Sequence, residues 1–348
     1  MSMLSEMAES PEVIRQVIEV NRDRIEQFVT SSDGKASHVL IAARGTSDNA
    51  ARYAQYVWGA RNRLSVGLAA PSLFGPYASA PSLTDALVVG MSQSGQSPDV
   101  VEVVREAARQ GRPTVAFTNH LQSPLATAAD LVIDLAAGEE RSVAASKTYV
   151  AELAAVALWS ESLSAASGIG TGRSEAAPLE LTGIPELVEM VLADRRQVEE
   201  AVAGLVDHDR CVIVGRGFHH ATAFEWALKL QELTYVLAQP FSAADLLHGP
   251  IALLQPGFPV LMVATGGPLL ESMTDLARQL VDRRIHVVAI TDEIGFPAEQ
   301  RVVIPACDEW LSPLVAAPAL QAFAHALALA KGLDPEQPRG LTKVTRTR

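Results

Sequence analysis

Short apolar runs alternate with helical patterns along most of the chain. The runs are continuous rather than interrupted by polar residues, which is typical of parallel strands buried on both faces. Helical patterns at residues 100–109 and 146–160 follow two of them. This order predicts βαβ units with right-handed crossovers. The runs of this first set lie at residues 38–42, 86–89, 114–117 and 131–135.

The same order of elements occurs a second time. Residues 38–45 (HVLIAARG) resemble residues 210–217 (RCVIVGRG), and each segment ends at an Arg-Gly pair before a helical pattern. Such a duplication predicts an α/β protein of two similar lobes, each a three-layer αβα sandwich around a parallel sheet. The second set continues with apolar runs at residues 260–263, 286–290 and 301–304 and helical patterns at 270–281 and 313–331.

Composition along the chain suggests where the lobes begin and end. The segment between the two copies is rich in Gly, Ser, Thr and Pro, which is typical of a linker, and Ser10-Pro11 suits a helix start. We expect an N-terminal helix over residues 1–30, a first lobe over 31–165, a linker over 166–184, a second lobe over 185–335 and a C-terminal tail over 336–348.

Charge and composition exclude several classes of partner. The 348 residues carry 28 Lys and Arg against 40 Asp and Glu, a net charge of −12, which argues against nucleic acid and anionic membranes. Two cysteines give no disulfide framework and no metal-ligand spacing. The N-terminus lacks a signal-peptide pattern, and the apolar stretch 315–330 is interrupted by Pro318, Gln321 and His325. We therefore expect a soluble cytoplasmic protein.

Small polar residues gather after the strands of the first lobe, where open parallel sheets bind ligands. Residues 92–99 (SQSGQSPD) place Ser97 and Pro98 at a helix start, whose N–H groups and dipole favour an anion. Residues 45–49 (GTSDN) and 142–147 (SVAASK) follow two other strands. One such loop is most simply a turn, but three at one edge predict a small phosphate ester. The nucleotide-binding motifs GxxxxGK[ST] and strand-anchored GxGxxG are missing from the sequence.

The second lobe supplies ionisable groups instead. Glu225, Lys229 and Glu232 have the i, i+4, i+7 spacing of one helix face in an apolar context. His248 stands before a Gly-Pro pair, and Lys343 follows a turn near the C-terminus. Taken singly, Glu225 and Lys229 are equally well a surface ion pair, whereas a lone His248 is more simply a capping or core residue and Lys343 a solvated tail. Together they predict proton transfer beside a sugar carbonyl.

These segments together resemble the sugar isomerase (SIS) family, above all the isomerase half of glucosamine-6-phosphate synthase. The resemblance runs in order along nearly the whole chain, and it implies two SIS lobes and a bound hexose 6-phosphate. The segments that carry it are Gly45-Thr46-Ser47, Ser92-Gln93-Ser94-Gly95, residues 225–232 (EWALKLQE), His248-Gly249-Pro250 and residues 338–343 (PRGLTK).

The resemblance also implies roles for single residues. Glu232 would be the base that moves a proton between carbons 1 and 2, with Lys229 beside it. His248 would open the sugar ring from a neighbouring subunit, which implies a homodimer, and Lys343 would lie near the open-chain carbonyl. Glu225 and Thr342 are further site candidates. The phosphate would be bound by Gly45, Thr46, Ser47, Ser92, Gln93, Ser94, Ser97, Val143 and Ala145.

Departures from the synthase narrow the expected activity. Residue 2 is Ser rather than the nucleophilic Cys of a glutaminase, so we expect no glutaminase domain, and Ala145 replaces a phosphate-contacting serine. The loop 142–147 and the tail 338–345 are similar to those of stand-alone type II glucosamine-6-phosphate deaminases. We expect conversion of glucosamine 6-phosphate to fructose 6-phosphate and ammonia, with no metal or organic cofactor. The alternatives are a fructosamine-6-phosphate deglycase, another amino-sugar phosphate isomerase, and a non-catalytic sugar-phosphate-binding regulator.

Overall fold

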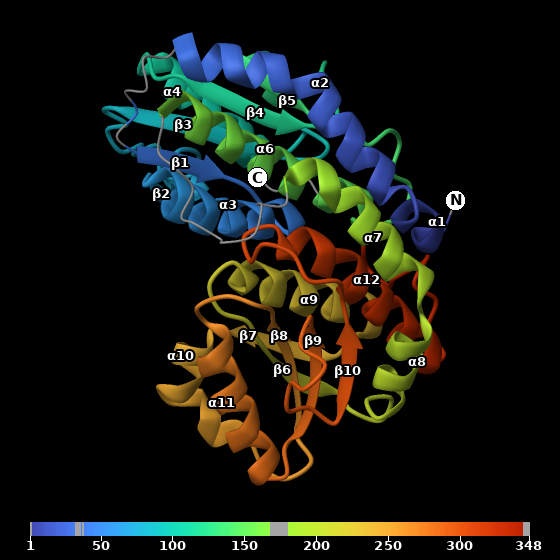
Figure 1. The fold of residues 1–348 in the computed structure, drawn as a ribbon. Helices are drawn as coiled ribbons and strands as arrows, with labels where there is room; N and C mark the ends of the chain where they lie inside the picture. Colours follow the sequence, from blue (N-terminus) through green and yellow to red (C-terminus); the bar gives the residue numbers. More distant parts are fainter. Residues whose placement is uncertain (1, 32–35, 37, 168–179, 344–348) are drawn as a thin grey trace. The chain divides into compact units, whose positions relative to one another are not determined.

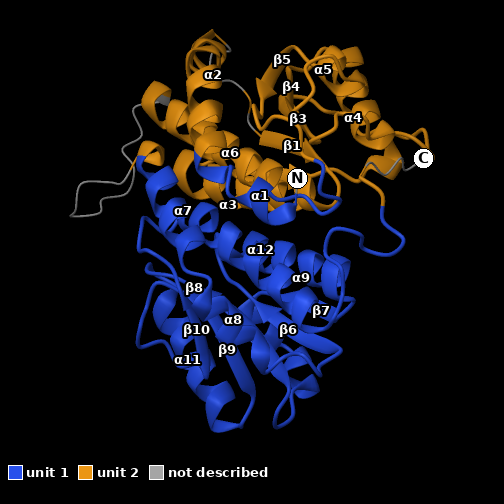
Figure 2. Cartoon of the chain, turned by 90° about the vertical axis from the view of Figure 1, so that its right-hand side faces the viewer, with its two compact units in different colours: residues 1–11, 141–146, 183–341 blue, residues 12–140, 147–182, 342–348 orange. Residues whose placement is uncertain are grey.

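The computed structural model describes residues 2–31, 36, 38–167 and 180–343. Most of the expected linker (168–179) and the last five residues of the expected tail lie outside this set. The chain forms two compact units, coloured separately in Figure 2. Unit 1 consists of Met1–Pro11, Arg141–Ser146 and Gly183–Leu341, and unit 2 of Glu12–Glu140, Lys147–Thr182 and Thr342–Arg348.

Unit 2 contains the first copy of the repeat as a five-stranded parallel sheet in the order β2-β1-β3-β4-β5 (Figure 1). Helices α4 (Pro98–Arg109) and α5 (Pro124–Ala128) pack on one face, against alternate residues of β3 such as Val88. Helices α3 (Thr46–Asn62) and α6 (Lys147–Ser167) pack on each other and cover the other face, and α2 (Ser10–Ser31) precedes the sheet. The strands are β1 (His38–Ala42), β2 (Ser65–Leu68), β3 (Ala86–Met91), β4 (Thr114–Thr118) and β5 (Leu131–Asp134), with η1 at Pro71–Leu73.

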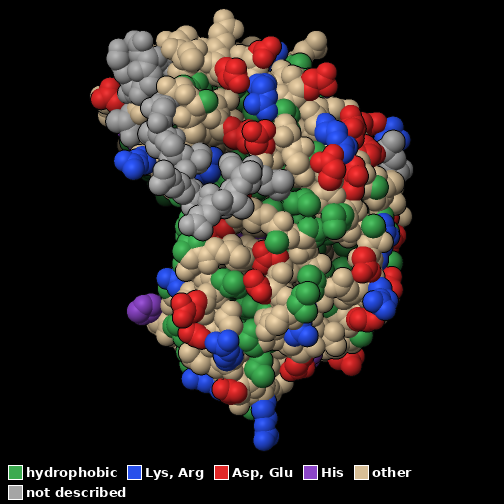
Figure 3. Space-filling model, viewed as in Figure 1, with side chains coloured by type: hydrophobic (Ala, Val, Ile, Leu, Met, Phe, Trp, Pro, Cys, Tyr) green, Lys and Arg blue, Asp and Glu red, His purple; other side chains and the backbone are tan. Residues whose placement is uncertain are grey.

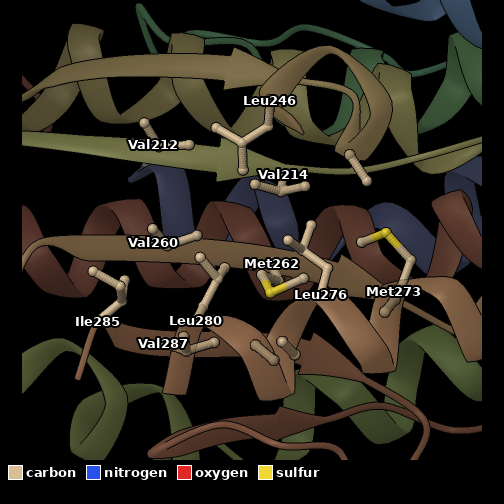
Figure 4. Close-up of a cluster of buried hydrophobic side chains, with 14 of the residues drawn as sticks. Val212, Val214, Leu246, Val260, Met262, Met273, Leu276, Leu280, Ile285 and Val287 are labelled. Carbon is tan, nitrogen blue, oxygen red and sulfur yellow. The ribbon is translucent and has the colours of Figure 1, made fainter. Parts of the chain in front are cut away.

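Unit 1 repeats this plan with the parallel order β10-β9-β8-β6-β7. Two helices on one face enclose a cluster of buried apolar side chains, in which Val214 and Met262 of the sheet meet Leu276 (Figure 4). Its strands are β6 (Arg210–Val214), β7 (Leu237–Phe241), β8 (Pro259–Ala264), β9 (His286–Thr291) and β10 (Gln300–Val303). Its helices are α1 (Met3–Met7), α7 (Ile184–Ala193), α8 (Arg196–Ala203), α9 (His219–Thr234), α10 (Ala243–Leu247), α11 (Leu270–Asp282) and α12 (Ser312–Ala330), with η2 at Leu181–Gly183 and η3 at Pro250–Leu253.

The two-lobed α/β architecture expected from the repeat is therefore confirmed, with one more strand in each lobe. The added strands, β2 and β7, are edge strands next to β1 and β6. Strand β2 is largely exposed and β7 contains Pro240, so neither has the continuous apolar run of a central strand. An edge strand has only one neighbour to satisfy, and Pro is tolerated there.

Helix α12 is long and apolar enough to cross a membrane by length and composition, and 78% of its most apolar window is buried inside the structure. It packs against α9, α8 and α7 of the same unit, and the Phe323 ring stands edge-on to Trp226 at 5.0 Å between centroids. A buried core helix passes the same test of length and hydropathy. On the face drawn in Figure 3, acidic and basic side chains of the described residues are interspersed.

Each compact unit includes short segments that are distant in sequence from the rest of that unit. The first eleven residues, including α1, group with unit 1, although α2 continues in unit 2. Residues Arg141–Ser146, between β5 and α6 of unit 2, also group with unit 1. The domain boundaries expected from the sequence stay a prediction, since compactness and repeat boundaries need not coincide.

Candidate functional site

The first turn of the predicted phosphate site joins β1 to α3 in unit 2. Gly45 has φ +57°, in the left-handed region that favours glycine, and Thr46 and Ser47 open the helix. Ser47 is buried, and its hydroxyl lies 2.6 Å from Oε1 of Glu152, to which it donates. The hydroxyl proton of Ser47 is thus committed to a carboxylate, which leaves its oxygen free to accept.

The second turn, residues 92–97 between β3 and α4, folds on itself. Gly95 N–H donates to the carbonyl of Ser92 (3.0 Å) and to its Oγ (3.2 Å), and Gln96 N–H donates to Ser94 Oγ (3.3 Å). The carbonyl of Gln93 accepts from the amide of Asn119 at 3.1 Å. Since β1 and β3 are neighbouring parallel strands, these two turns emerge at the same edge of the sheet, as predicted.

Ser97 stands at the predicted N-cap position of α4, but its side chain makes no capping hydrogen bond. Its Oγ lies 3.4 Å from Ser92 Oγ instead. Pro98 at the first helical position has no N–H to offer, and Asp99 Oδ1 accepts from the next amide, of Val100, at 3.0 Å. The Ser97 hydroxyl is therefore directed into the turn rather than along the helix.

Replacing Gly95 with alanine should destabilise the protein by about 1–3 kcal/mol. Gly95 has φ +60°, and an added Cβ would lie 2.1 Å from Ser123 Oγ. Gly111 is a matched control, because it has a similar φ of +66° and no atom within 4 Å of an added Cβ. Urea unfolding of both variants separates backbone strain from the steric clash. Equal losses of stability in the two would show that Ser123 does not constrain the turn.

Sequence reasoning missed Arg44, which connects the two turns. Its Nε lies 2.6 Å from Oδ2 of Asp99, in the first turn of α4. Arg44 is the arginine of the Arg-Gly pair that occurs in both copies of the repeat. The repeat therefore singled out its position in the sequence but did not indicate Asp99 as its partner. The ion pair joins the turn before α3 to the first turn of α4, and the Asp99 carboxylate offsets the charge of the guanidinium.

The remaining phosphate-loop candidates belong to a different unit. Val143 and Ala145 are half-buried and lie in Arg141–Ser146, which groups with unit 1. Lys147, which follows them, begins α6 of unit 2 and is buried. The role of Val143 and Ala145 as phosphate contacts stays a prediction.

The C-terminal candidate Lys343 is not a solvated side chain. Its Nζ lies 2.6 Å from Oε2 of Glu140, whose side chain is fully buried. The Glu140 carboxylate also accepts from Thr148, through the amide at 3.1 Å and the hydroxyl at 2.8 Å. All three residues belong to unit 2, and neighbouring Thr342 is exposed. The ion pair holds the Lys343 amine at the start of α6.

Helix α9 of unit 1 brings three ionisable side chains together, as the spacing predicted. Lys229 Nζ lies 2.5 Å from Glu232 Oε2 and 3.5 Å from Glu225 Oε1. The side chains of Lys229 and Glu225 are fully buried, so the surface-ion-pair interpretation is wrong. Glu232 is 22% exposed and has the one carboxylate of the group that solvent or substrate can reach. Lys229 stabilises its negative charge.

His248 is neither a core residue nor buried. It ends α10, where its amide donates to the carbonyls of Ala244 and Asp245 at 3.2 Å, and it is exposed. Gly249 then has φ +148°, a backbone conformation that side-chain-bearing residues rarely adopt. The Gly-Pro pair thus sets the direction of the chain after the histidine, and the ring-opening role of His248 stays a prediction.

A second histidine, His219, is buried at the start of α9 in a network of hydroxyls. Its Nε2 lies 2.8 Å from Thr265 Oγ1 and 2.9 Å from Ser312 Oγ, and its Nδ1 lies 3.1 Å from Thr222 Oγ1. Ser312 Oγ already donates to the carbonyl of Glu309 (2.6 Å), so the ring donates to it through Nε2. Burial lowers the pKa of His219 to about 3, and the ring is neutral at neutral pH.

This buried histidine should make the protein less stable in acid. The unfolded chain takes up a proton near the ordinary pKa of 6.5, whereas the folded protein does so only near 3. Between these values the unfolded state binds one more proton, so the free energy of unfolding falls by up to about 1.4 kcal/mol per pH unit from this group. Urea unfolding between pH 7 and 4 should show a shallower pH slope for His219→Gln. The same slope in both proteins would contradict the assignment.

In the part of the chain that the structure describes, no group of three or more His, Cys, Asp or Glu side chains is arranged to hold a metal ion. The polar groups of the candidate sites are hydroxyls, amides, carboxylates, the ammonium groups of Lys229 and Lys343, the Arg44 guanidinium and the His248 imidazole. Such donors suit a phosphate ester and proton transfer.

Known proteins match this chain in two segments, one in each lobe. The SIS domain profile matches residues 34–160 and 204–328. Glutamine–fructose-6-phosphate aminotransferase (isomerizing) from Thermococcus kodakarensis is 32% identical over 347 residues, which are 98% of this chain and 57% of that protein. The chain thus spans little more than half the length of this curated relative.

Solved structures show the same fold. The C-terminal domain of glucosamine-fructose-6-phosphate aminotransferase from Francisella tularensis superposes with a TM-score of 0.86 at 25% identity, covering 97% of this chain and 98% of that one. Glucosamine-6-phosphate deaminase from Thermotoga maritima gives 0.77 at 19% identity over 99% of both chains. The second likeness concerns the fold alone.

Proposed function

Because the chain belongs to the SIS domain family, with both repeats matched by its profile, we propose that it is an aldose–ketose isomerase of a hexose 6-phosphate. Its relative from Thermococcus kodakarensis carries an isomerizing activity in its name, and 98% of this chain matches it. The observation that carries the proposal is the α9 group, in which a partly exposed Glu232 is held 2.5 Å from the buried ammonium of Lys229. A positioned carboxylate of this kind can take and return a proton.

In the proposed reaction, the turns of unit 2 hold the phosphate. The hydroxyls of Ser92, Ser94 and Ser97, the α4 N-terminus and the Arg44 guanidinium supply donors and positive potential for it. Glu232 removes the proton from carbon 2 of the open-chain sugar and returns it to carbon 1. Lys343, oriented by Glu140, is proposed to lie near the carbonyl oxygen.

The finer proposal is deamination of glucosamine 6-phosphate. The proton on carbon 2 moves to carbon 1, and a second proton passes from the amine nitrogen to the carbonyl oxygen, so the aldehyde becomes an alcohol and the amine becomes an imine at carbon 2. Water then adds to the imine carbon and ammonia leaves, which yields fructose 6-phosphate. The similarity of the 142–147 loop and the 338–345 tail to type II deaminases supports this choice.

We also propose that the protein works as a homodimer. The exposed His248 needs a sugar-binding surface facing it to act in ring opening, and the resemblance to the SIS family implies that a second subunit supplies this surface. Sedimentation of the purified protein tests this point. A monomer with full activity would contradict it.

The deciding experiment incubates the purified protein with glucosamine 6-phosphate and measures ammonia and fructose 6-phosphate together. Equal amounts of the two products support the deaminase. Product from a fructosamine 6-phosphate alone identifies a deglycase. Thermal stabilisation by hexose phosphates without any turnover identifies a sugar-phosphate-binding regulator.

A further inference from the structure

The short helix α1 contains a carboxylate with an unusual role within unit 1. The side chain of Glu6 is fully buried. Its Oε1 lies 2.5 Å from the amide nitrogen of Arg141, and its Oε2 lies 3.1 Å from that of Ser142. Two consecutive backbone N–H groups, 135 and 136 residues away in the sequence, therefore donate to one carboxylate.

A buried carboxylate is costly unless charge-assisted hydrogen bonds satisfy it. The amides of Arg141 and Ser142 do so, and in return Glu6 fixes the backbone where Arg141–Ser146 begins. The far end of that segment is also held, because buried Gln321 of α12 donates through Nε2 to the carbonyl of Ser146 at 3.0 Å. Unit 1 thus anchors the segment at both ends.

Between the anchors lie Val143 and Ala145, for which the resemblance to the SIS family implies contacts with the sugar phosphate. Val143 and Ala145 are half-buried there. The Oγ of Ser142 is buried and has no hydrogen-bond partner among the described residues. A hydroxyl without a partner is a polar group that a ligand can satisfy. The position of this segment therefore bears directly on what it can contact.

Helix α1 holds a second segment in the same unit. The amide of Met3 donates to both carboxylate oxygens of Glu336, at 2.9 and 3.1 Å. Ser2 and Ser5 form a reciprocal capping box that fixes the first turn of the helix. One five-residue helix thereby contacts both residues 141–142 and residue 336.

We propose that Glu6 is a positioning residue of the active site, which acts through the backbone of Arg141–Ser146. This inference rests on the proposed function, because the sugar phosphate of that function is the ligand that the segment is predicted to contact. Glu6 itself touches no reacting atom. Its role is to hold the loop in one conformation, and a displacement near 1 Å can reduce turnover about 100-fold.

The test compares Glu6→Gln with Glu12→Gln, which changes an exposed carboxylate on α2 whose contacts, with Arg15 and Gln16, are local to that helix. Glutamine keeps the shape of Glu6 but weakens its bonds to the two amides. We expect hydrogen–deuterium exchange in a peptide covering 141–142 to become about tenfold faster. We expect kcat/KM for glucosamine 6-phosphate to fall about 10- to 100-fold, mainly through kcat. Glu12→Gln should change neither.

Three outcomes would overturn the inference: unchanged exchange at 141–142, faster exchange with full activity, or a loss of activity matched by the loss of folded protein alone. Glu6→Asp, which keeps the charge at a shorter reach, serves if Glu6→Gln does not fold, and the same two readouts apply. Wild-type protein without turnover on any hexose phosphate contradicts the proposed function instead. The exchange rates then still decide whether Glu6 anchors the loop.

Discussion

Glu232→Gln should lower turnover of the hexose 6-phosphate by about 10²- to 10⁴-fold, the usual contribution of a positioned acid–base group. Glutamine has the same shape but cannot take a proton. Lys229 keeps a second carboxylate, Glu225, at 3.5 Å, so the helix should stay folded. Steady-state kinetics give the loss of turnover, and the thermal shift caused by glucosamine 6-phosphate should be retained.

Two further measurements make this result specific. Glu271→Gln changes an exposed glutamate at the start of α11 in the same unit and should leave turnover unchanged. A Glu232→Gln enzyme with turnover within about threefold of wild type would exclude Glu232 as the base, since that loss is far below the range for acid–base catalysis. Loss of the thermal shift along with turnover would indicate a binding role instead.

Lys229→Met should cost about 3–5 kcal/mol of folding free energy, because it leaves a buried charge without its counter-charge. Lys229 is fully buried with Nζ 3.5 Å from the fully buried Glu225 and 2.5 Å from Glu232. Methionine fills the space of the lysine stem, so the loss is electrostatic rather than a cavity. Urea unfolding measures it.

The matched variants separate charge from packing. Adding Glu225→Gln to Lys229→Met removes the buried negative charge that the ammonium of Lys229 faced, and should recover part of the lost stability. Arg278→Met breaks an exposed ion pair of 2.8 Å with Asp275 and should cost less than about 1 kcal/mol. Equal losses for Lys229→Met and Arg278→Met would show that the α9 group is not a buried ion pair.

Residue spacing was enough to predict the α9 group but not its surroundings. The i, i+4, i+7 positions place Glu225, Lys229 and Glu232 on one face of any regular helix. Whether that face is exposed depends on what packs against it, and the flanking residues are largely apolar. The sequence therefore left a surface ion pair and a buried group equally open. Packing of α12 against α9 accompanies the burial.

Other features of the candidate site join residues that no local pattern connects. Arg44 pairs with Asp99 across 55 residues and Glu140 with Lys343 across 203, while the Glu6 carboxylate accepts from the backbone amide of Arg141 across 135. Each residue alone is an ordinary charged side chain in the sequence. Which residues meet at such separations depends on how the chain folds in three dimensions. The periodicity of apolar residues along the sequence does not predict this.

By itself the sequence determined the repeated α/β plan, the central parallel strands and the turns that follow them. Buried strands and helix starts can be predicted locally, because they depend on short runs of apolar residues and on the residue types that favour turns and helix caps. Only the tertiary structure decided which ionisable groups are buried, where the edge strands pair and which distant carboxylates hold the loops. Those outcomes depend on long-range packing, and a hydrogen bond or ion pair gains its strength from the neighbours that exclude water around it.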